Sequence, residues 1–145
     1  MPYQYRISME FCKIFQRLCE EFYIILRTKI PDVIVEEHLY NDDGPALFIS
    51  SSQNAREIKE ICVDAETSIM GGRMMDIDVM DEKGVSVGRS DVGFPPRRCF
   101  ICGRPAAVCT SRRLHSRQEI CSYVEQMKAK IENRLESSIP NQQHK

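Results

Sequence analysis

The spacing of apolar residues changes along the chain from a helical period to a strand period and back, and this alternation limits the fold more than any other feature. Over residues 8–29 apolar side chains recur at intervals of three and four, the pattern of a helix with one buried face. Pro31 blocks the continuation of this helix. Residues 33–39 are rich in β-branched side chains, 41–45 are turn-forming, and 46–49 provide a second short strand. We therefore expect a helix followed by a β-hairpin.

The rest of the chain repeats the alternation. The expected elements are a helix over 55–68, strands over 74–80 and 85–89, a loop over 93–110 and a helix over 118–135. The serines at 50–52 are available as an N-cap for the first of these helices, and Gly71-Gly72 ends it. Together the elements predict an α+β fold: about four mixed or antiparallel strands with three helices, nucleotidyltransferase-like, plus a Cys/His-rich loop.

Length and composition fit a single soluble domain. The chain has 145 residues, of which 42% are hydrophobic and 28% charged. We expect one domain over 1–136 and a polar, disordered tail over 137–145. No apolar run reaches the roughly 18 residues that span a membrane, and the N-terminus lacks the apolar core of a secretory signal. A cytoplasmic location without membrane contact follows as an expectation.

A pair of aspartates marks the predicted strand that follows the glycines. Side chains two apart on a strand point to the same face, so Asp76 and Asp78 would present two carboxylates side by side. Neighbouring carboxylates repel unless a cation lies between them, and such oxygen ligands suit Mg²⁺ on substrate phosphates. The alternative is a solvated strand face with two ordinary aspartates. Gly71 and Gly72 either end the helix or let a phosphate approach the backbone, where Arg73 can reach the same anion.

Cysteine and histidine residues in the predicted loop have the spacing of metal ligands. Cys99, Cys102, Cys109 and His115 supply three thiolates and one imidazole, a complete tetrahedral set for structural Zn²⁺. A metal would order a loop that has few apolar residues. The alternative is three free cysteines beside an unrelated surface histidine. The odd total of seven cysteines argues against a disulfide framework, and the other four fall among apolar neighbours as core residues.

Arginine is concentrated in the same loop. Six arginines and no acidic residue lie between Arg97 and Arg117, in a chain whose net charge is −1. Guanidinium groups suit phosphate oxygens, which favours a polyphosphate substrate, an acidic carrier protein or RNA as the partner. A merely solvated basic loop is the alternative.

Several of these motifs, in this order, resemble one family of enzymes. They are Gly72-Arg73-Met74-Met75-Asp76-Ile77-Asp78-Val79, then Arg89, Pro95-Pro96-Arg97-Arg98-Cys99 with Cys102, Ala106-Ala107-Val108-Cys109, and His115. They are similar to the hallmark of the CitX family, the apo-citrate lyase phosphoribosyl-dephospho-CoA transferases. Glu66 matches an acidic position shortly before that hallmark. The resemblance is close over residues 55–130 and looser from residue 8.

The resemblance implies transfer of the phosphoribosyl-dephospho-CoA group from triphosphoribosyl-dephospho-CoA to a serine of the acyl-carrier subunit of citrate lyase, with release of diphosphate. Asp76 and Asp78 would hold Mg²⁺ on the donor phosphates in this nucleotidyl-type transfer, while Arg73 neutralises developing charge. The attacking serine belongs to the partner, and the choice of general base between the two aspartates stays open. The residues assigned to substrate binding are Gly71, Gly72, Arg89, Arg97 and Arg98.

Two further expectations compete with full activity. The family pattern begins a few dozen residues earlier, so the resemblance implies an N-terminally truncated chain whose activity is impaired by the missing segment. A different class of function is a non-catalytic, zinc-stabilised module that grips RNA or an acidic protein through the arginine-rich loop. A third interpretation is a family member that retains only the fold. The enzyme interpretation expects no nucleic-acid partner.

Overall fold

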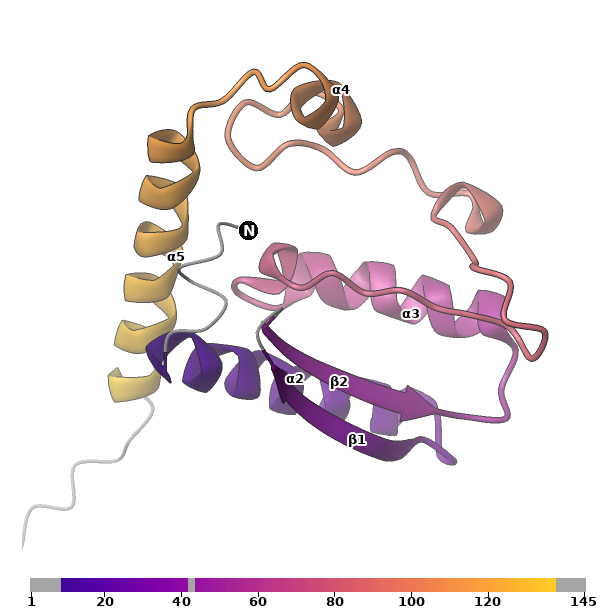
Figure 1. Ribbon diagram of the computed structural model, residues 1–145. Helices are drawn as coiled ribbons and strands as arrows, with labels where there is room; N and C mark the ends of the chain where they lie inside the picture. Colours follow the sequence, from indigo (N-terminus) through magenta and orange to yellow (C-terminus); the bar gives the residue numbers. More distant parts are fainter. Residues whose placement is uncertain (1–8, 42–43, 138–145) are drawn as a thin grey trace, which may run out of the picture.

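The computed structural model describes residues 9–41 and 44–137 (Figure 1). Its elements, in chain order, are α2 (Met9–Lys29), β1 (Ile34–Asn41), β2 (Gly44–Ser50), α3 (Ala55–Ser68), η1 (Gly72–Met74), η2 (Ser90–Val92), α4 (Ala106–Ser111) and α5 (Arg117–Ser137), where η marks a short 3-10 helix. The fold is α+β, as expected. Within the described residues it has one more helix and fewer strands than the sequence predicted.

The first two long helices follow the predicted periodicity. Helix α2 covers the predicted range from residue 9, since residue 8 lies outside the described part, and its apolar face is buried. Helix α3 occupies the predicted 55–68, but the predicted serine cap is wrong because Asn54 accepts the hydrogen bond from the backbone N–H of Arg56. The hydroxyls of Ser51 and Ser52 instead donate to the carboxylate of Asp32.

The first hairpin is confirmed. Strands β1 and β2 pair antiparallel, with Ile34 opposite Ser50, and a bulge interrupts the register between Val35 and Glu37. The glycine that starts β2, Gly44, has a φ of 110°, which a residue with a side chain would adopt only under strain. Strand β2 contacts α2, and its Ile49 packs against the same core as Ile58 of α3 (Figure 1).

The second predicted hairpin is reduced to its turn over 81–84 and one antiparallel bridge, and the expected four-stranded sheet is wrong: the described residues form a sheet of two strands. Residues 75–79 are not assigned to a strand; the N–H of Val87 donates to the carbonyl of Val79 at 2.8 Å, beside an isolated bridge between Met80 and Ser86. Side chains take the place of a partner strand, because Lys59 donates to the carbonyl of Ile77 at 2.9 Å and Arg97 donates to that of Met75 at 2.7 Å. The nucleotidyltransferase-like fold stays a prediction.

The core lies where α2, α3, the hairpin and the later turns of α5 meet. Its buried members are Ile14, Leu18, Phe22, Leu26, Ile30, Val33, Cys62, Ala65, Ile69, Met75, Val79 and Ile131. Helix α5 confirms the helix predicted over 118–135, and its Ile131 brings it onto the core. Ser137, which was assigned to the tail, is the last residue of α5, and the rest of the predicted tail lies outside the described residues.

The predicted loop over 93–110 contains a short helix, α4, that the Pro, Gly and Cys content hid. Pro105 stands immediately before it, where a fixed φ and a missing N–H are tolerated. Helix α4 carries Cys109 inward, so the helix serves the cluster described below. None of the helices in the described ranges is long and apolar enough to cross a membrane.

Candidate functional site

The four predicted metal ligands come together. The three sulfurs of Cys99, Cys102 and Cys109 and a ring nitrogen of His115 all lie within 4.8 Å of one another. The Cys99 sulfur is 3.3 Å from His115 Nε2, and the Cys102 and Cys109 sulfurs are 3.5 Å apart. These separations are near the edge of a zinc tetrahedron, about 3.8 Å for bonds of about 2.3 Å. The cluster therefore has the donors and the spacing to hold a metal ion such as zinc.

A tight turn of backbone presents the first two sulfurs. The N–H of Cys99 donates to the carbonyl of Arg104 at 2.6 Å, and the N–H of Gly103 donates back to Cys99 at 2.9 Å. Gly103 has a φ of 73°, the left-handed conformation such a turn requires. The sequence favours this local structure because a glycine stands directly after the CxxC segment.

The surroundings of the first cysteine favour its thiolate. Burial raises the pKa of Cys99, but hydrogen bonds from the backbone N–H groups of Cys102 and Ile101, and from the thiols of Cys109 and Cys102, lower it to about 7. Burial and the neighbouring thiols raise the pKa of Cys109 to about 12. His115 Nδ1 lies 3.9 Å from the carboxylate of Glu119, and His115 Nε2 faces the Cys99 sulfur.

A groove of about 770 Å³ lies beside the cluster, between the segment around η1 and the start of α5. Its wall includes Cys99, Cys109 and His115, so the cluster and the groove share residues. The basic residues that border it are Arg73, Arg97, Arg98, Arg113 and Arg117. Asp76 is the acidic residue in the lining, and its side chain is 91% exposed. The groove is thus a strongly cationic surface with one carboxylate at its edge.

A buried carboxylate holds two of the arginines. The side chain of Glu66, at the end of α3, is only 5% exposed and pairs with Arg89 at 3.2 Å and with Arg97 at 3.6 Å. Arg97 also pairs with Asp76 at 3.3 Å and donates to the carbonyl of Arg73 at 3.2 Å. The guanidinium group of Arg97 therefore lies between two carboxylates, the buried one of Glu66 and the exposed one of Asp76.

The other arginines of the predicted site have different settings. Arg73 donates to the carbonyl of Arg98, which connects η1 to the loop that carries Cys99 and Cys102, called the cysteine loop below. The Nε of Arg73 has no hydrogen-bond partner among the described residues. Arg98 donates to the carbonyl of Gly103 and is otherwise exposed in the groove. Arg89 does not border the groove, and its guanidinium group pairs with the buried Glu66 instead. Three of the four predicted arginines thus gather at the groove.

The two predicted aspartates are exposed and alternate with buried Met75 and Val79 and half-buried Ile77. They border different hollows, however. Asp76 lines the arginine groove, whereas Asp78 lines a second hollow of about 970 Å³ between β2 and the start of α3. The joint magnesium site of Asp76 and Asp78 stays a prediction.

The two glycines are buried and do not border the groove in the described part of the chain. Gly71 has a φ of 83°, and a Cβ there would lie 2.6 Å from the side chain of Ile131. A Cβ on Gly72 would lie 2.8 Å from the carbonyl oxygen of Glu66. The close packing of α3, η1 and α5 therefore accounts for both glycines, and their role in phosphate binding stays a prediction.

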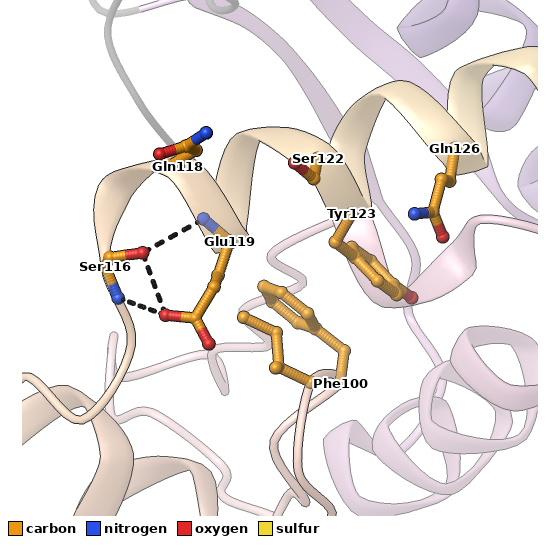
Figure 2. Close-up of a pocket in the computed structure, with 8 residues that line it drawn as sticks. Phe100, Ser116, Gln118, Glu119, Ser122, Tyr123 and Gln126 are labelled. Carbon is orange, nitrogen blue, oxygen red and sulfur yellow. Dashed lines mark hydrogen bonds between the residues drawn. The ribbon is translucent and has the colours of Figure 1, made fainter.

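Sequence reasoning missed an aromatic pair at the groove. The rings of Phe100 and Tyr123 stack with centroids 4.3 Å apart and an angle of 22° between their planes (Figure 2). Both residues line the arginine groove and also a neighbouring hollow of about 480 Å³. Their separation in the sequence hid the contact, although the position of Phe100 inside the CxxC segment was a usable signal.

These features define a small α+β domain with a Cys₃His cluster at the wall of an arginine-lined groove. The model of the family described as "CitX: Apo-citrate lyase phosphoribosyl-dephospho-CoA transferase" matches residues 1–131. The chain belongs to this family. The match begins at residue 1, earlier than the resemblance noted from the motifs.

Similar curated proteins carry the same description. They include the apo-citrate lyase phosphoribosyl-dephospho-CoA transferases of Escherichia coli O9:H4 (strain HS) and of Shigella boydii serotype 18 (strain CDC 3083-94 / BS512). Each is 34% identical to this chain over 87 residues, which is 60% of this chain and 48% of the relative. The chain spans about half the length of the curated relatives it matches.

Proposed function

We propose that the chain transfers the phosphoribosyl-dephospho-CoA group from triphosphoribosyl-dephospho-CoA to a serine of the citrate lyase acyl-carrier subunit and releases diphosphate. The observation that carries this proposal is the groove in which Arg73, Arg97 and Arg98 gather beside Asp76. One guanidinium group can donate two parallel hydrogen bonds to the oxygens of a phosphate. A groove with several guanidinium groups therefore suits a triphosphate. The family membership and the names of the relatives support the same reaction.

The transfer exchanges one phosphorus–oxygen bond for another. The hydroxyl oxygen of the carrier serine bonds to the phosphorus nearest the ribose of the donor, while the bond from that phosphorus to its bridging oxygen breaks. Diphosphate leaves with the electron pair, and the arginines of the groove stabilise the charge that develops on it. The serine proton passes to a carboxylate, and of the two candidates, Asp76 and Asp78, Asp76 borders the groove.

Magnesium is proposed at the same carboxylate. An exposed oxygen donor such as Asp76 fits an ion that keeps several waters and takes one or two carboxylates together with substrate phosphates. The ion would supply charge neutralisation on the donor phosphates. Since Arg97 pairs with Asp76, a cation must compete with that arginine for the carboxylate. Asp78 is proposed to contribute less to magnesium binding, because it borders the other hollow.

Zinc is proposed at the Cys₃His cluster as a structural ion. Three thiolates and one imidazole complete a tetrahedron and leave no open position for a substrate, which separates this site from catalysis. The ion would fix the loop that carries Arg98 and would thereby hold one wall of the groove.

The direct test mixes the purified chain with the donor, magnesium and the acyl-carrier subunit, and follows the mass of the carrier. We expect a gain of one prosthetic group per carrier and release of diphosphate. Asp76→Asn should slow the transfer by about a hundredfold or more, whereas Asp78→Asn should slow it less. A carrier with its serine replaced by alanine is the control for the acceptor.

Two outcomes would reject these assignments. No transfer by the wild-type chain would reject the proposed function itself. Undiminished transfer by Asp76→Asn would leave the function standing and remove the aspartate from it.

The second candidate function is a binding module without catalysis. It is favoured by the exposure of Arg98, Arg104, Arg112 and Arg113 on one loop, which suits RNA or an acidic protein. Such binding would weaken linearly in a log–log plot against salt, and both aspartates would be dispensable.

A further inference from the structure

The stacked pair of Phe100 and Tyr123 lines two neighbouring hollows. One is the arginine groove, and the other is the hollow of about 480 Å³ at the start of α5. Phe100 stands between two metal-cluster cysteines, yet it is 41% exposed. Part of the Phe100 residue is therefore accessible from the groove, where a flat ligand could stack on the aromatic pair.

We propose that Phe100 and Tyr123 form a platform for the nucleobase of the donor, which makes the arginine groove a nucleotide site and not only a polyphosphate site. This inference rests on the proposed function, because it takes the donor phosphates to lie among the arginines. In the donor, two linked riboses join the triphosphate to the nucleobase, so a site that binds both must offer a cationic surface and a flat surface within one groove. The lining of this groove contains Arg97, Arg98, Phe100 and Tyr123 together.

The packing of the two rings makes the platform rigid. Tyr123 is held in α5, and Phe100 is held in the tight turn of the cysteine loop, so neither ring must be ordered when a base arrives. A base that stacks on an aromatic ring contributes a substantial share of nucleotide affinity with little dependence on base identity. The platform therefore adds affinity without adding charge.

Polar side chains of α5 stand at the edge of the platform. Glu119 and Gln126 lie on the same side of the helix as Tyr123, toward Phe100, as their spacing of four and three residues requires (Figure 2). The Glu119 carboxylate already accepts bonds from Ser116, at 2.7 Å from its N–H and 2.8 Å from its hydroxyl. The amide of Gln126 can both donate and accept, and it is the group suited to the rim of a base.

The experiment compares ADP with inorganic diphosphate by titration calorimetry, because the two probes differ by the nucleoside. Wild-type protein should bind ADP at least about tenfold more tightly than diphosphate. Phe100→Leu should weaken ADP binding by about 5- to 100-fold and leave diphosphate binding unchanged. Phe100→Tyr keeps the ring and should restore ADP binding. Etheno-ADP should lose fluorescence on binding to wild type and not to Phe100→Leu.

Phe48→Leu is the matched control, since Phe48 is 52% exposed on β2 and borders neither hollow. Zinc content is measured for every variant, so that a disturbed cysteine loop is recognised. Equal affinity of wild type for ADP and diphosphate would overturn the platform and leave the arginine groove standing. Equal weakening of both probes by Phe100→Leu would also overturn it. Failure of both probes to bind would overturn the proposed function, and the platform with it.

Discussion

At the scale of single residues, the buried carboxylate of Glu66 decides how the arginines stand. It is one of two charged residues that are buried in the described part of the chain, the other being Lys59. Glu66 follows Cys62 by four residues and so falls on the inward side of α3, where a charge needs a partner. Two arginines meet that need. The sequence carries a signal for the burial of Glu66, namely a charged residue on an apolar helix face. A search for apolar periodicity alone does not detect this signal.

Glu66→Gln is expected to lower the free energy of unfolding by about 1–3 kcal/mol, because the neutral amide leaves Arg89 and Arg97 without their buried counter-charge. Both arginines can still reach solvent, which keeps the loss below that of a fully enclosed pair. Urea unfolding followed by circular dichroism measures it. Glu60→Gln, an exposed change on the same helix, should alter stability by less than about 0.5 kcal/mol; a similar loss in both variants would contradict the role of Glu66.

Asp32 gives a pH dependence of known sign. Hydrogen bonds from the hydroxyl and N–H of Ser52 and from the hydroxyl of Ser51 lower its pKa from 3.8 to about 2. A pKa lowered by folding stabilises the protein above the ordinary value, and this contribution is lost as the pH falls through about 2. Asp32→Asn should therefore lower the urea midpoint near neutral pH, and the difference from wild type should shrink from about pH 4 downward. A difference that is constant with pH would contradict this.

At the scale of elements, apolar periodicity predicted the helices and the hairpin that depend on residues near one another in the sequence. It did not predict structure that depends on contacts between distant residues. Helices α2, α3 and α5 and the first hairpin follow from apolar spacing and turn residues that lie within each segment. The segment 75–79 has the alternation of a strand, but Lys59 and Arg97 satisfy its carbonyls where a strand was expected. Alternation shows which side chains are buried, and it does not show what the backbone bonds to.

The Cys₃His cluster was predictable because its members are near one another in the sequence. Cys99, Cys102, Cys109 and His115 are close in sequence, and coordination chemistry restricts their spacing. The arginine groove was only partly predictable. Local enrichment pointed to Arg97 and Arg98, while the exclusion of Arg89 depends on its ion pair with Glu66, which lies 23 residues earlier in the chain and which arginine enrichment does not identify.

The cysteine loop with α4 should depend on zinc. Purified protein is expected to contain about one equivalent of zinc, because the four ligand atoms already lie together. Cys102→Ser should lose most of it, whereas Cys12→Ser, which changes a cysteine of α2 outside the cluster, should keep it. Metal analysis by mass spectrometry measures this. Less than about half an equivalent in the wild-type protein, or equal zinc in both variants, would contradict a zinc site.

At the scale of the whole molecule, the groove forms because segments far apart in the sequence meet. The turn after α3 supplies Arg73 and Asp76, the cysteine loop supplies Arg97 and Arg98, and α5 closes the wall with Tyr123. Figure 1 shows the cysteine loop and α4 set apart from the core elements, above α3 and beside the start of α5. The core thus positions only one wall of the groove, and the cysteine loop positions the other.

The central claim, that this groove binds a chain of phosphates, is tested most directly by calorimetric titration with tripolyphosphate. Arg98→Gln removes a charge that borders the groove, and Arg112→Gln removes an exposed charge of the same loop that does not. We predict that Arg98→Gln weakens binding by about tenfold and Arg112→Gln by less than about twofold, because only the first guanidinium reaches the phosphates. Equal weakening by the two variants would mean that the basic loop binds anions without a defined site, and it would contradict the account.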